Sequence, residues 1–147
     1  MRLILSFAIL MAASLPPVAM AAETGRWWTE DKKAVMEIDV CPEGICGKLV
    51  GFVEPYDEKG QPKLAKNGQP ECGLQIMHAH KGEDAGEWEG IITDPRDLSD
   101  WKLHLNYRPD GGLHLRGYVL VPLLGKSQDW DAFSGSVNAK CEITSGK

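Results

Sequence analysis

Two histidines at strand spacing, His78 and His80, are the residues of this chain whose types most directly suggest chemistry. In an extended strand the side chains of residues i and i+2 point to the same face, so these two imidazoles could begin a zinc or copper site. His104 and His114, on a later pair of expected strands, could add ligands. A metal centre needs three or four converging ligands, and exposed histidines at a strand end are the alternative interpretation. We therefore expect no metal ion and no other cofactor, with His78 and His80 as the weak metal candidates.

A second kind of candidate chemistry lies in four carboxylates close together in the sequence: Glu87, Glu89, Asp94 and Asp97. Glycosidases use two carboxyl groups whose environments push their pKa values apart. These four fall in turns or on a polar face, which favours solvated charge, and no serine stands in the context of a nucleophile elbow. We expect no catalytic residue, and the sequence leans towards a protein without enzymatic activity.

The chain contains four cysteines: Cys41, Cys46, Cys72 and Cys141. In an exported protein four cysteines indicate two disulfides, for which three pairings exist. The turn-like sequence Pro42–Ile45 favours a Cys41–Cys46 bridge that closes a hairpin, which leaves Cys72 for Cys141. A site of four thiolates is the alternative, but it lacks a Cys-x-x-Cys pair.

The elements that position these residues are predicted to be β-strands. Between Trp101 and Tyr107 apolar and polar residues alternate, as in a half-buried strand. The turn Arg108–Gly112 follows, and alternation resumes from Leu113 to Val121. These two strands predict a hairpin. Six further strands are expected at 25–29, 34–40, 46–54, 72–80, 87–93 and 128–133.

Eight short strands in sequence predict an all-β fold, a single antiparallel up-and-down barrel with its core at 25–133. A barrel of eight strands is just wide enough to be filled by side chains or to hold one small ligand. The segment 55–71, rich in proline and glycine, is expected to be a loop. It could be a functional lid, or a surface excursion tied down by Cys72.

The inward faces of these strands supply the residues expected to line a ligand pocket: Trp88, Leu103, Leu105, Leu115 and Val119. A packed core of large rings is the alternative, because aromatic side chains fill small barrels well. Gly90 and Gly117 lie on the same apolar faces, where they could leave room for a ligand or let a neighbouring ring sit close.

The first 21 residues have the features of a secretory signal peptide. A positive start at Arg2 precedes the apolar run Leu3–Leu15, and Ala19-Met20-Ala21 offers a small-x-small cleavage pattern. The run is short for a membrane anchor. Cleavage after Ala21 would leave residues 22–147 as one domain in the periplasm or outside the cell. The formal net charge of −5 argues against nucleic acid as a partner.

Several motifs resemble a family of secreted bacterial proteins known as domain-of-unknown-function family 2147. The matching stretches, in chain order, are Gly25-x-Trp27-x-Thr29-Glu30-Asp31, Cys41, Cys46-Gly47, Cys72-Gly73-Leu74, Trp88-x-Gly90, Asp94-Pro95, Leu115-Arg116-Gly117-Tyr118 and Leu124-Gly125-x-Ser127-Gln128-x-Trp130. Ser99-Asp100-Trp101 departs from the Gly and Tyr expected there. The resemblance implies a small calycin-like barrel and no established activity.

The opening Gly25-x-Trp27 is also similar to the Gly-x-Trp signature of lipocalins. In those barrels the Trp plugs one end and a basic side chain often covers it. The resemblance therefore implies structural roles for Trp27 and Arg116, with the guanidinium stacked on Trp27 or Trp28.

Three functional hypotheses follow. The first is a non-enzymatic binder of a small apolar or amphipathic ligand in the cell envelope. The second is a filled barrel that interacts with another protein or the cell wall through the 55–71 loop or the tail. The third is an envelope hydrolase. A pocket of about 300 Å³ or more would favour the first hypothesis.

Overall fold

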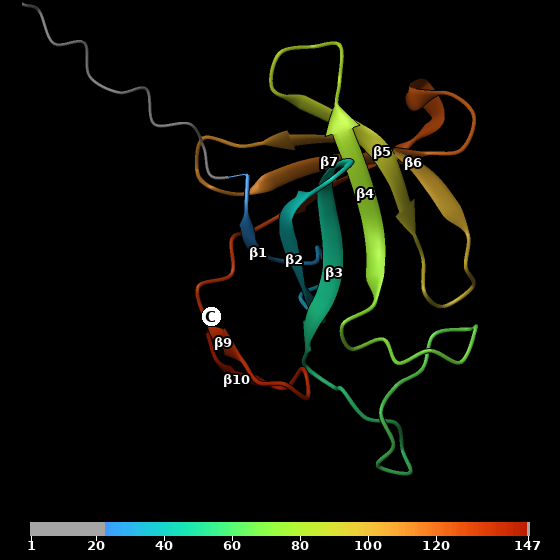
Figure 1. Cartoon of the computed structure of the whole chain (residues 1–147), viewed down its shortest axis with the longest axis vertical. Coiled ribbons are helices and arrows are strands. Elements are labelled where there is room, and N and C mark those ends of the chain that lie inside the picture. The colour runs from blue at the N-terminus through green and yellow to red at the C-terminus, as the bar shows by residue number, and fades with distance from the viewer. Residues whose placement is uncertain (1–22, 147) are drawn as a thin grey trace, which may run out of the picture.

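The computed structural model describes residues 23–146, in which eight antiparallel strands follow one another around a barrel (Figure 1). The strands are β1 (Gly25–Trp28), β2 (Ala34–Cys41), β3 (Gly44–Phe52), β4 (Gln75–Lys81), β5 (Glu87–Thr93), β6 (Asp100–Tyr107), β7 (Leu113–Tyr118) and β8 (Lys126–Trp130). Each strand pairs with the next in the chain. The predicted signal peptide at 1–21 lies outside the described residues.

The barrel closes between its first strand and the segment that follows its last. The amide of Trp28 donates to the carbonyl of Asp131 at 2.9 Å, and the amide of Phe133 donates to the carbonyl of Arg26 at 2.8 Å. These bonds satisfy the edge of β1, which would otherwise stay exposed. The predicted all-β up-and-down barrel is confirmed.

The predicted hairpin is present, but its second strand is shorter than expected. β7 ends at Tyr118 instead of Val121, and residues 119–125 form a loop with a 3₁₀ turn, η1 (Pro122–Leu124). Pro122 has no amide hydrogen, so the ladder cannot continue through it. β8 begins two residues earlier than predicted, at Lys126.

One end of the barrel is filled by a compact apolar core. Trp27 donates from Nε1 to the carbonyl of Gly111 at 2.8 Å, and its ring lies edge-on to Tyr107 at 5.8 Å. Trp88 and Leu105 belong to the same buried cluster. Trp27 thus closes the end of the barrel at which the turn from β6 to β7 lies, as the lipocalin resemblance implies.

The C-terminal tail forms a small second layer outside the barrel, which the sequence did not predict. Its strands β9 (Ser136–Val137) and β10 (Ile143–Ser145) pair with each other. Val137 and Ile143 pack over a second buried cluster of Trp28, Val35 and Phe133. The tail therefore covers apolar side chains that β1 and β2 direct away from the barrel.

Both disulfides pair as predicted. Cys41 joins Cys46 across the hairpin of β2 and β3, and Cys72 joins Cys141, which ties the tail to the segment just before β4. The Cys72–Cys141 bridge also anchors the neighbouring segment 55–71.

The segment 55–71 is more ordered than the sequence suggested. It contains two tight turns, closed by bridges between Tyr56 and Pro62 and between Leu64 and Pro70. The Tyr56 hydroxyl donates to Glu142 of the tail at 2.8 Å. These contacts agree with a surface excursion held down beside Cys72.

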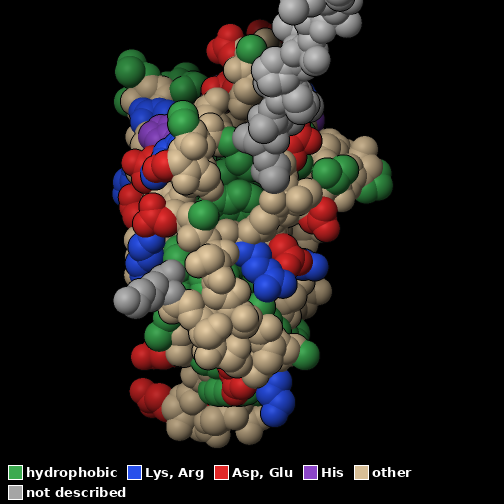
Figure 2. Space-filling model, turned by 90° about the vertical axis from the view of Figure 1, so that its left-hand side faces the viewer, with side chains coloured by type: hydrophobic (Ala, Val, Ile, Leu, Met, Phe, Trp, Pro, Cys, Tyr) green, Lys and Arg blue, Asp and Glu red, His purple; other side chains and the backbone are tan. Residues whose placement is uncertain are grey.

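On the face shown in Figure 2, acidic and basic side chains lie next to one another without an extended patch of one sign. Among residues 23–146 no helix has the length and hydropathy that a membrane-spanning helix requires.

Candidate ligand-binding cavity

The end of the barrel opposite Trp27 holds an open cavity of about 930 Å³. Its deep wall is apolar and buried, and includes Met36, Leu103, Leu115 and Trp130. Trp101 and Ile92 extend this wall towards the mouth. Ligand pockets commonly measure about 300–1,000 Å³, so the barrel has room for one small molecule.

Gly117 is the residue that keeps part of this space open. A Cβ added at Gly117 would find its nearest neighbour, Cβ of Trp101, only at 3.8 Å. Gly90 differs, because a Cβ there would lie 2.0 Å from the carbonyl oxygen of His78. Of the two inward glycines, Gly117 leaves room in the cavity and Gly90 permits close packing of β5 on β4.

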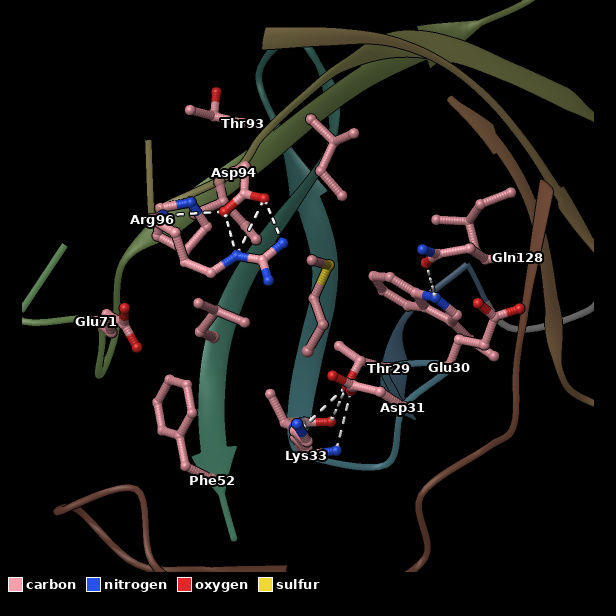
Figure 3. A pocket seen from close by; sticks show the side chains of 18 of the residues that line it. Thr29, Glu30, Asp31, Lys33, Phe52, Glu71, Thr93, Asp94, Arg96 and Gln128 are labelled. Atoms are coloured by element: carbon pink, nitrogen blue, oxygen red, sulfur yellow. Dashed lines mark hydrogen bonds and ion pairs between the residues drawn. The ribbon is translucent and has the colours of Figure 1, made fainter. Parts of the chain in front are cut away.

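Two polar side chains of β8, Gln128 and Lys126, stand among the apolar ones. Both line the cavity, because alternate residues of a strand share a face with Trp130. The indole Nε1 of Trp130 donates to Gln128 Oε1 at 2.8 Å (Figure 3). Since that bond occupies the amide oxygen, the two amide hydrogens of Gln128 are left to donate into the cavity. No hydrogen-bond or ion-pair partner of the Lys126 ammonium occurs among residues 23–146.

Charged side chains form the rim of the cavity. Arg96 donates to both oxygens of Asp94, with Nη2 at 2.5 Å from Oδ2 (Figure 3). The guanidinium holds the pKa of Asp94 below its usual value. Asp31 accepts from the Thr29 hydroxyl at 2.8 Å and from the Lys33 amide at 3.1 Å. Apolar depth with a charged mouth suits a ligand that has one apolar and one polar end.

The predicted pocket residues divide into three groups. Leu103 and Leu115 line the cavity. Trp88 and Leu105 are buried in the core that fills the opposite end. Val119 was wrongly placed in the interior: β7 ends one residue before it, and its side chain is 58% exposed on the loop.

Arg116 does not stack on Trp27 or Trp28, so this expectation is also wrong. Its guanidinium points outward and donates to the carbonyls of Pro122 at 2.6 Å and Leu123 at 3.2 Å, and to the Ser127 hydroxyl at 2.8 Å. Arg116 alternates with the inward Leu115 and Gly117, which places it on the outer face of β7. It fixes the loop between β7 and β8.

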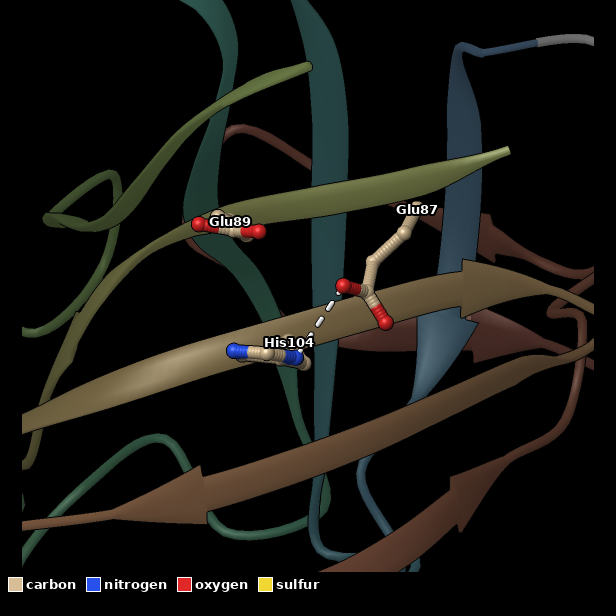
Figure 4. A group of neighbouring side chains, drawn as sticks. All are labelled: Glu87, Glu89 and His104. Atoms are coloured by element: carbon tan, nitrogen blue, oxygen red, sulfur yellow. Dashed lines mark ion pairs between the residues drawn. The ribbon is translucent and has the colours of Figure 1, made fainter. Parts of the chain in front are cut away.

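His78 and His80 are exposed on the outer face of β4, and within residues 23–146 neither belongs to a group of three potential metal ligands. The structure instead gathers Glu87, Glu89 and His104 on the outer face of β5 and β6 (Figure 4). Both His104 nitrogens already have partners: Nδ1 lies 3.1 Å from Glu87 and Nε2 lies 3.0 Å from the hydroxyl of Tyr118. A metal ion would have to displace one of these.

The outward position of this cluster separates it from the cavity. The order of residues along β5 and β6 places its side chains on the face opposite Leu103 and Trp88. The carboxylate-histidine group therefore cannot act on a molecule bound inside the barrel.

Comparison with known families matches residues 25–132 to a family model described as "Uncharacterized protein conserved in bacteria (DUF2147)". The chain belongs to this family. The matched range runs from the first residue of β1 to the segment that closes the barrel, so the DUF2147 match covers the whole barrel.

Among solved structures, the DUF2147 chain is similar to protein HP1028 from Helicobacter pylori, which is described as belonging to the lipocalin family. The two share 13% identity with a TM-score of 0.60, over 78% of this chain and 85% of the other. At this identity the likeness shows the fold, a lipocalin-like barrel. A comparison with curated proteins found no match.

Sequence reasoning missed the polar side chains of the cavity, Lys126 and Gln128. The sequence contains the signal for both: Lys126 and Gln128 precede Trp130 by four and two residues, so all three share one face of an extended strand. The expected strand began too late to include Lys126. As a site residue, Asp94 was considered only as one of four candidate carboxylates, and its partner Arg96 was not singled out.

Proposed function

We propose that this protein is an exported, non-enzymatic binder of one small amphipathic molecule, which it holds in the open half of its barrel within the cell envelope. The observation that carries the proposal is the cavity of about 930 Å³ behind Gly117, which exceeds the volume that favours a binding function over a filled barrel.

The wall chemistry supports an amphipathic ligand. A hydrocarbon portion would lie against Met36, Leu103 and Leu115, where it removes apolar surface from water. An oxygen-bearing head would reach the Gln128 amide and the Lys126 ammonium near the mouth. A carboxylate, phosphate or sulfonate head satisfies both donors.

Two disulfides support export, because such bridges persist in oxidising compartments. The predicted signal peptide would direct the chain there. The filled-barrel alternative is less favoured, because an open cavity of about 930 Å³ lies beside the packed core. The hydrolase alternative is not favoured by Asp94, the one candidate carboxylate of the sequence that lines the cavity, because Arg96 already pairs with it.

The direct test is binding of dodecanoate, followed by displacement of a fluorescent anilinonaphthalene sulfonate probe. We expect saturable one-site binding to the wild type and a loss of about tenfold or more in Gly117→Leu, because the new side chain occupies the cavity. Lys102→Leu is the matched control. It adds the same side chain to the exposed outer face of the neighbouring β6 and should bind as the wild type does.

Equal dodecanoate binding by Gly117→Leu and the wild type would overturn the proposal, as would no binding by a folded wild-type protein. The melting temperature and the near-ultraviolet circular dichroism of each variant establish that it is folded.

A further inference from the structure

The loop between β7 and β8 presents the largest concentration of exposed apolar side chains in the described chain. Its aliphatic residues are exposed as follows: Val119 58%, Leu120 76%, Val121 47%, Leu123 85% and Leu124 75%. The sequence from Val119 to Gly125 contains no polar side chain. A protein that leaves such a patch in water generally uses it to bind something apolar.

The loop is held in one conformation. Within it, the Leu124 amide donates to Val121 and the Gly125 amide donates to Pro122. From outside it, Arg116 donates to the carbonyls of Pro122 and Leu123. The backbone is thus drawn towards Arg116, and the side chains are left facing outward.

This internal hydrogen bonding matters because backbone groups that enter lipid must find partners within the protein. The carbonyls of Val121, Pro122 and Leu123 all have such partners, and Pro122 has no amide hydrogen to satisfy. The tip of the loop can therefore leave water without losing hydrogen bonds at these groups.

The charges around the base of the loop complement an anionic surface. Arg116 bonds only neutral oxygens, and within residues 23–146 neither Lys102 nor Lys126 pairs with a carboxylate. The nearby acidic group on β6, Asp100, accepts from the Thr93 hydroxyl. Three cations without acidic partners thus flank an apolar tip in a chain whose formal net charge is −5.

We propose that Val119–Leu124 is a membrane-docking loop, which inserts its aliphatic side chains into an anionic lipid surface while Lys102, Arg116 and Lys126 meet the phosphate groups. A loop of this size is far smaller than the about 20–30 residues a side of a stable protein interface, and it lacks polar side chains that would select a protein partner. A lipid surface requires neither.

The place of the docking loop in the fold links it to the cavity. Gly117 and Lys126 are the last pair of the β7–β8 ladder, and both line the cavity. The loop begins directly beyond them, so docking brings the mouth of the barrel to the lipid. The docking proposal itself does not depend on what the cavity holds.

Flotation with lipid vesicles tests the proposal on protein expressed from the full-length chain. Vesicles of phosphatidylglycerol and phosphatidylethanolamine should carry the wild type with them, and vesicles of phosphatidylcholine should carry less. The variant Leu123→Ser with Leu124→Ser should bind the anionic vesicles about tenfold or more weakly, because binding scales with the apolar area inserted.

The matched control is Val40→Ser with Leu64→Ser, which removes two aliphatic side chains of comparable exposure, 63% and 57%, away from the docking loop. It should float as the wild type does. Replacing Lys102 and Lys126 by Gln should reduce binding to the anionic vesicles by about fivefold per lysine and remove most of its salt dependence.

Three results would overturn the docking proposal. One is that the wild-type protein floats with neither type of vesicle. Another is a Leu123→Ser, Leu124→Ser variant that floats like its control. The third is a concentration-dependent dimer in sedimentation that this variant loses, which would assign the loop to a second copy of the chain. Dodecanoate binding should persist in the Leu123→Ser, Leu124→Ser variant, so the binding proposal and the docking proposal can be contradicted independently.

Discussion

At the scale of single residues, we expect Gln128 and Lys126 to decide which ligand the proposed binding cavity prefers. Both side chains are exposed at the mouth, where their donors lie beside the apolar wall of Leu115 and Trp130. A donor that meets an anionic acceptor there makes a charge-assisted hydrogen bond, which is stronger than a bond between neutral groups. An anionic head should therefore bind better than a neutral one on the same chain. We expect dodecanoate to bind more tightly than dodecanol.

The variant Lys126→Met with Gln128→Leu tests this preference. Dodecanoate affinity should fall by about tenfold or more while dodecanol affinity stays within about threefold, as expected for the loss of charged hydrogen bonds of about 1.5–3 kcal/mol. Isothermal titration calorimetry measures both affinities. If the affinities for dodecanoate and dodecanol fell by the same factor, these two residues would shape the cavity without binding the head group.

A second residue, Asp110, makes stability depend on pH at the closed end of the barrel. Arg108 lies beside it, with Nη2 at 2.5 Å from Oδ2, and holds the pKa of Asp110 at about 2. The Gly112 amide also donates to this carboxylate at 2.9 Å. Because the folded pKa is lower than the unfolded value of about 4, the stabilisation is complete above pH 4 and disappears as the pH falls to 2.

The matched variant is Asp110→Asn, which keeps an acceptor for Gly112 and removes the charge. Its melting temperature should lie below that of the wild type at pH 7, and the two should converge between about pH 4 and pH 2. A difference in melting temperature that stays constant across this range would contradict the role assigned to the Arg108–Asp110 pair.

At the scale of strands, two inward glycines should respond in opposite ways to the same change. Gly90→Ala forces a methyl group against the backbone of β4 and should reduce the free energy of unfolding by at least about 2 kcal/mol. Gly117→Ala adds a methyl group that meets Trp101 at an ordinary contact distance of 3.8 Å and should leave stability unchanged or raise it by up to about 1 kcal/mol. Urea denaturation measures both. Equal losses would show that Gly117 is not at an open position.

The two disulfides should also contribute unequally. In the chain-entropy model a loop closed over a sequence separation of 5 contributes about 2 kcal/mol, and one closed over 69 contributes about 4 kcal/mol. Replacing Cys72 and Cys141 by Ser should therefore lower the melting temperature more than replacing Cys41 and Cys46, and it should expose the tail after Phe133 to protease. A tail that resists protease without the bridge would show that β9 and β10 hold it by packing alone.

The strands were the most predictable elements, because the alternation of apolar and polar residues that indicates a strand is visible within a short stretch of sequence. From Trp101 to Leu115 the inward and outward faces follow from period two, and the hairpin register agrees. Val119 continued that pattern in the sequence but not in the fold, since β7 ends at Tyr118 and the chain then turns through residues 119–125. The lipocalin resemblance placed the Arg116 side chain over Trp27. In the structure Arg116 lies on the outer face of β7, where it donates to the carbonyl of Pro122 in the loop.

At the scale of the whole molecule, the size of the cavity could not be predicted from the sequence. A filled and a half-filled barrel have the same alternation, and the difference lies in how side chains from distant strands meet. Trp27, Trp88 and Tyr107 fill one end together, while Gly117 leaves the other open. The fold of the tail could not be predicted either, because it depends on packing over Trp28, a residue far away in the sequence.

Export is a prediction about the whole chain as well. Expression of the full-length protein in a bacterium with an intact secretion pathway should yield a periplasmic or secreted product whose N-terminal residue is Ala22. N-terminal sequencing measures this directly. A product that remains in the cytoplasm and retains Met1 would contradict the assigned compartment.

The central claim is that half of the barrel interior is a binding site, and native mass spectrometry tests it most directly. The protein should be purified without denaturation, saturated with dodecanoate and compared with Gly117→Leu. The account predicts one additional ligand mass on the wild type, released on unfolding and absent from Gly117→Leu. A wild type that appears only at the bare mass of the chain would contradict it and would favour a barrel that acts through its surface.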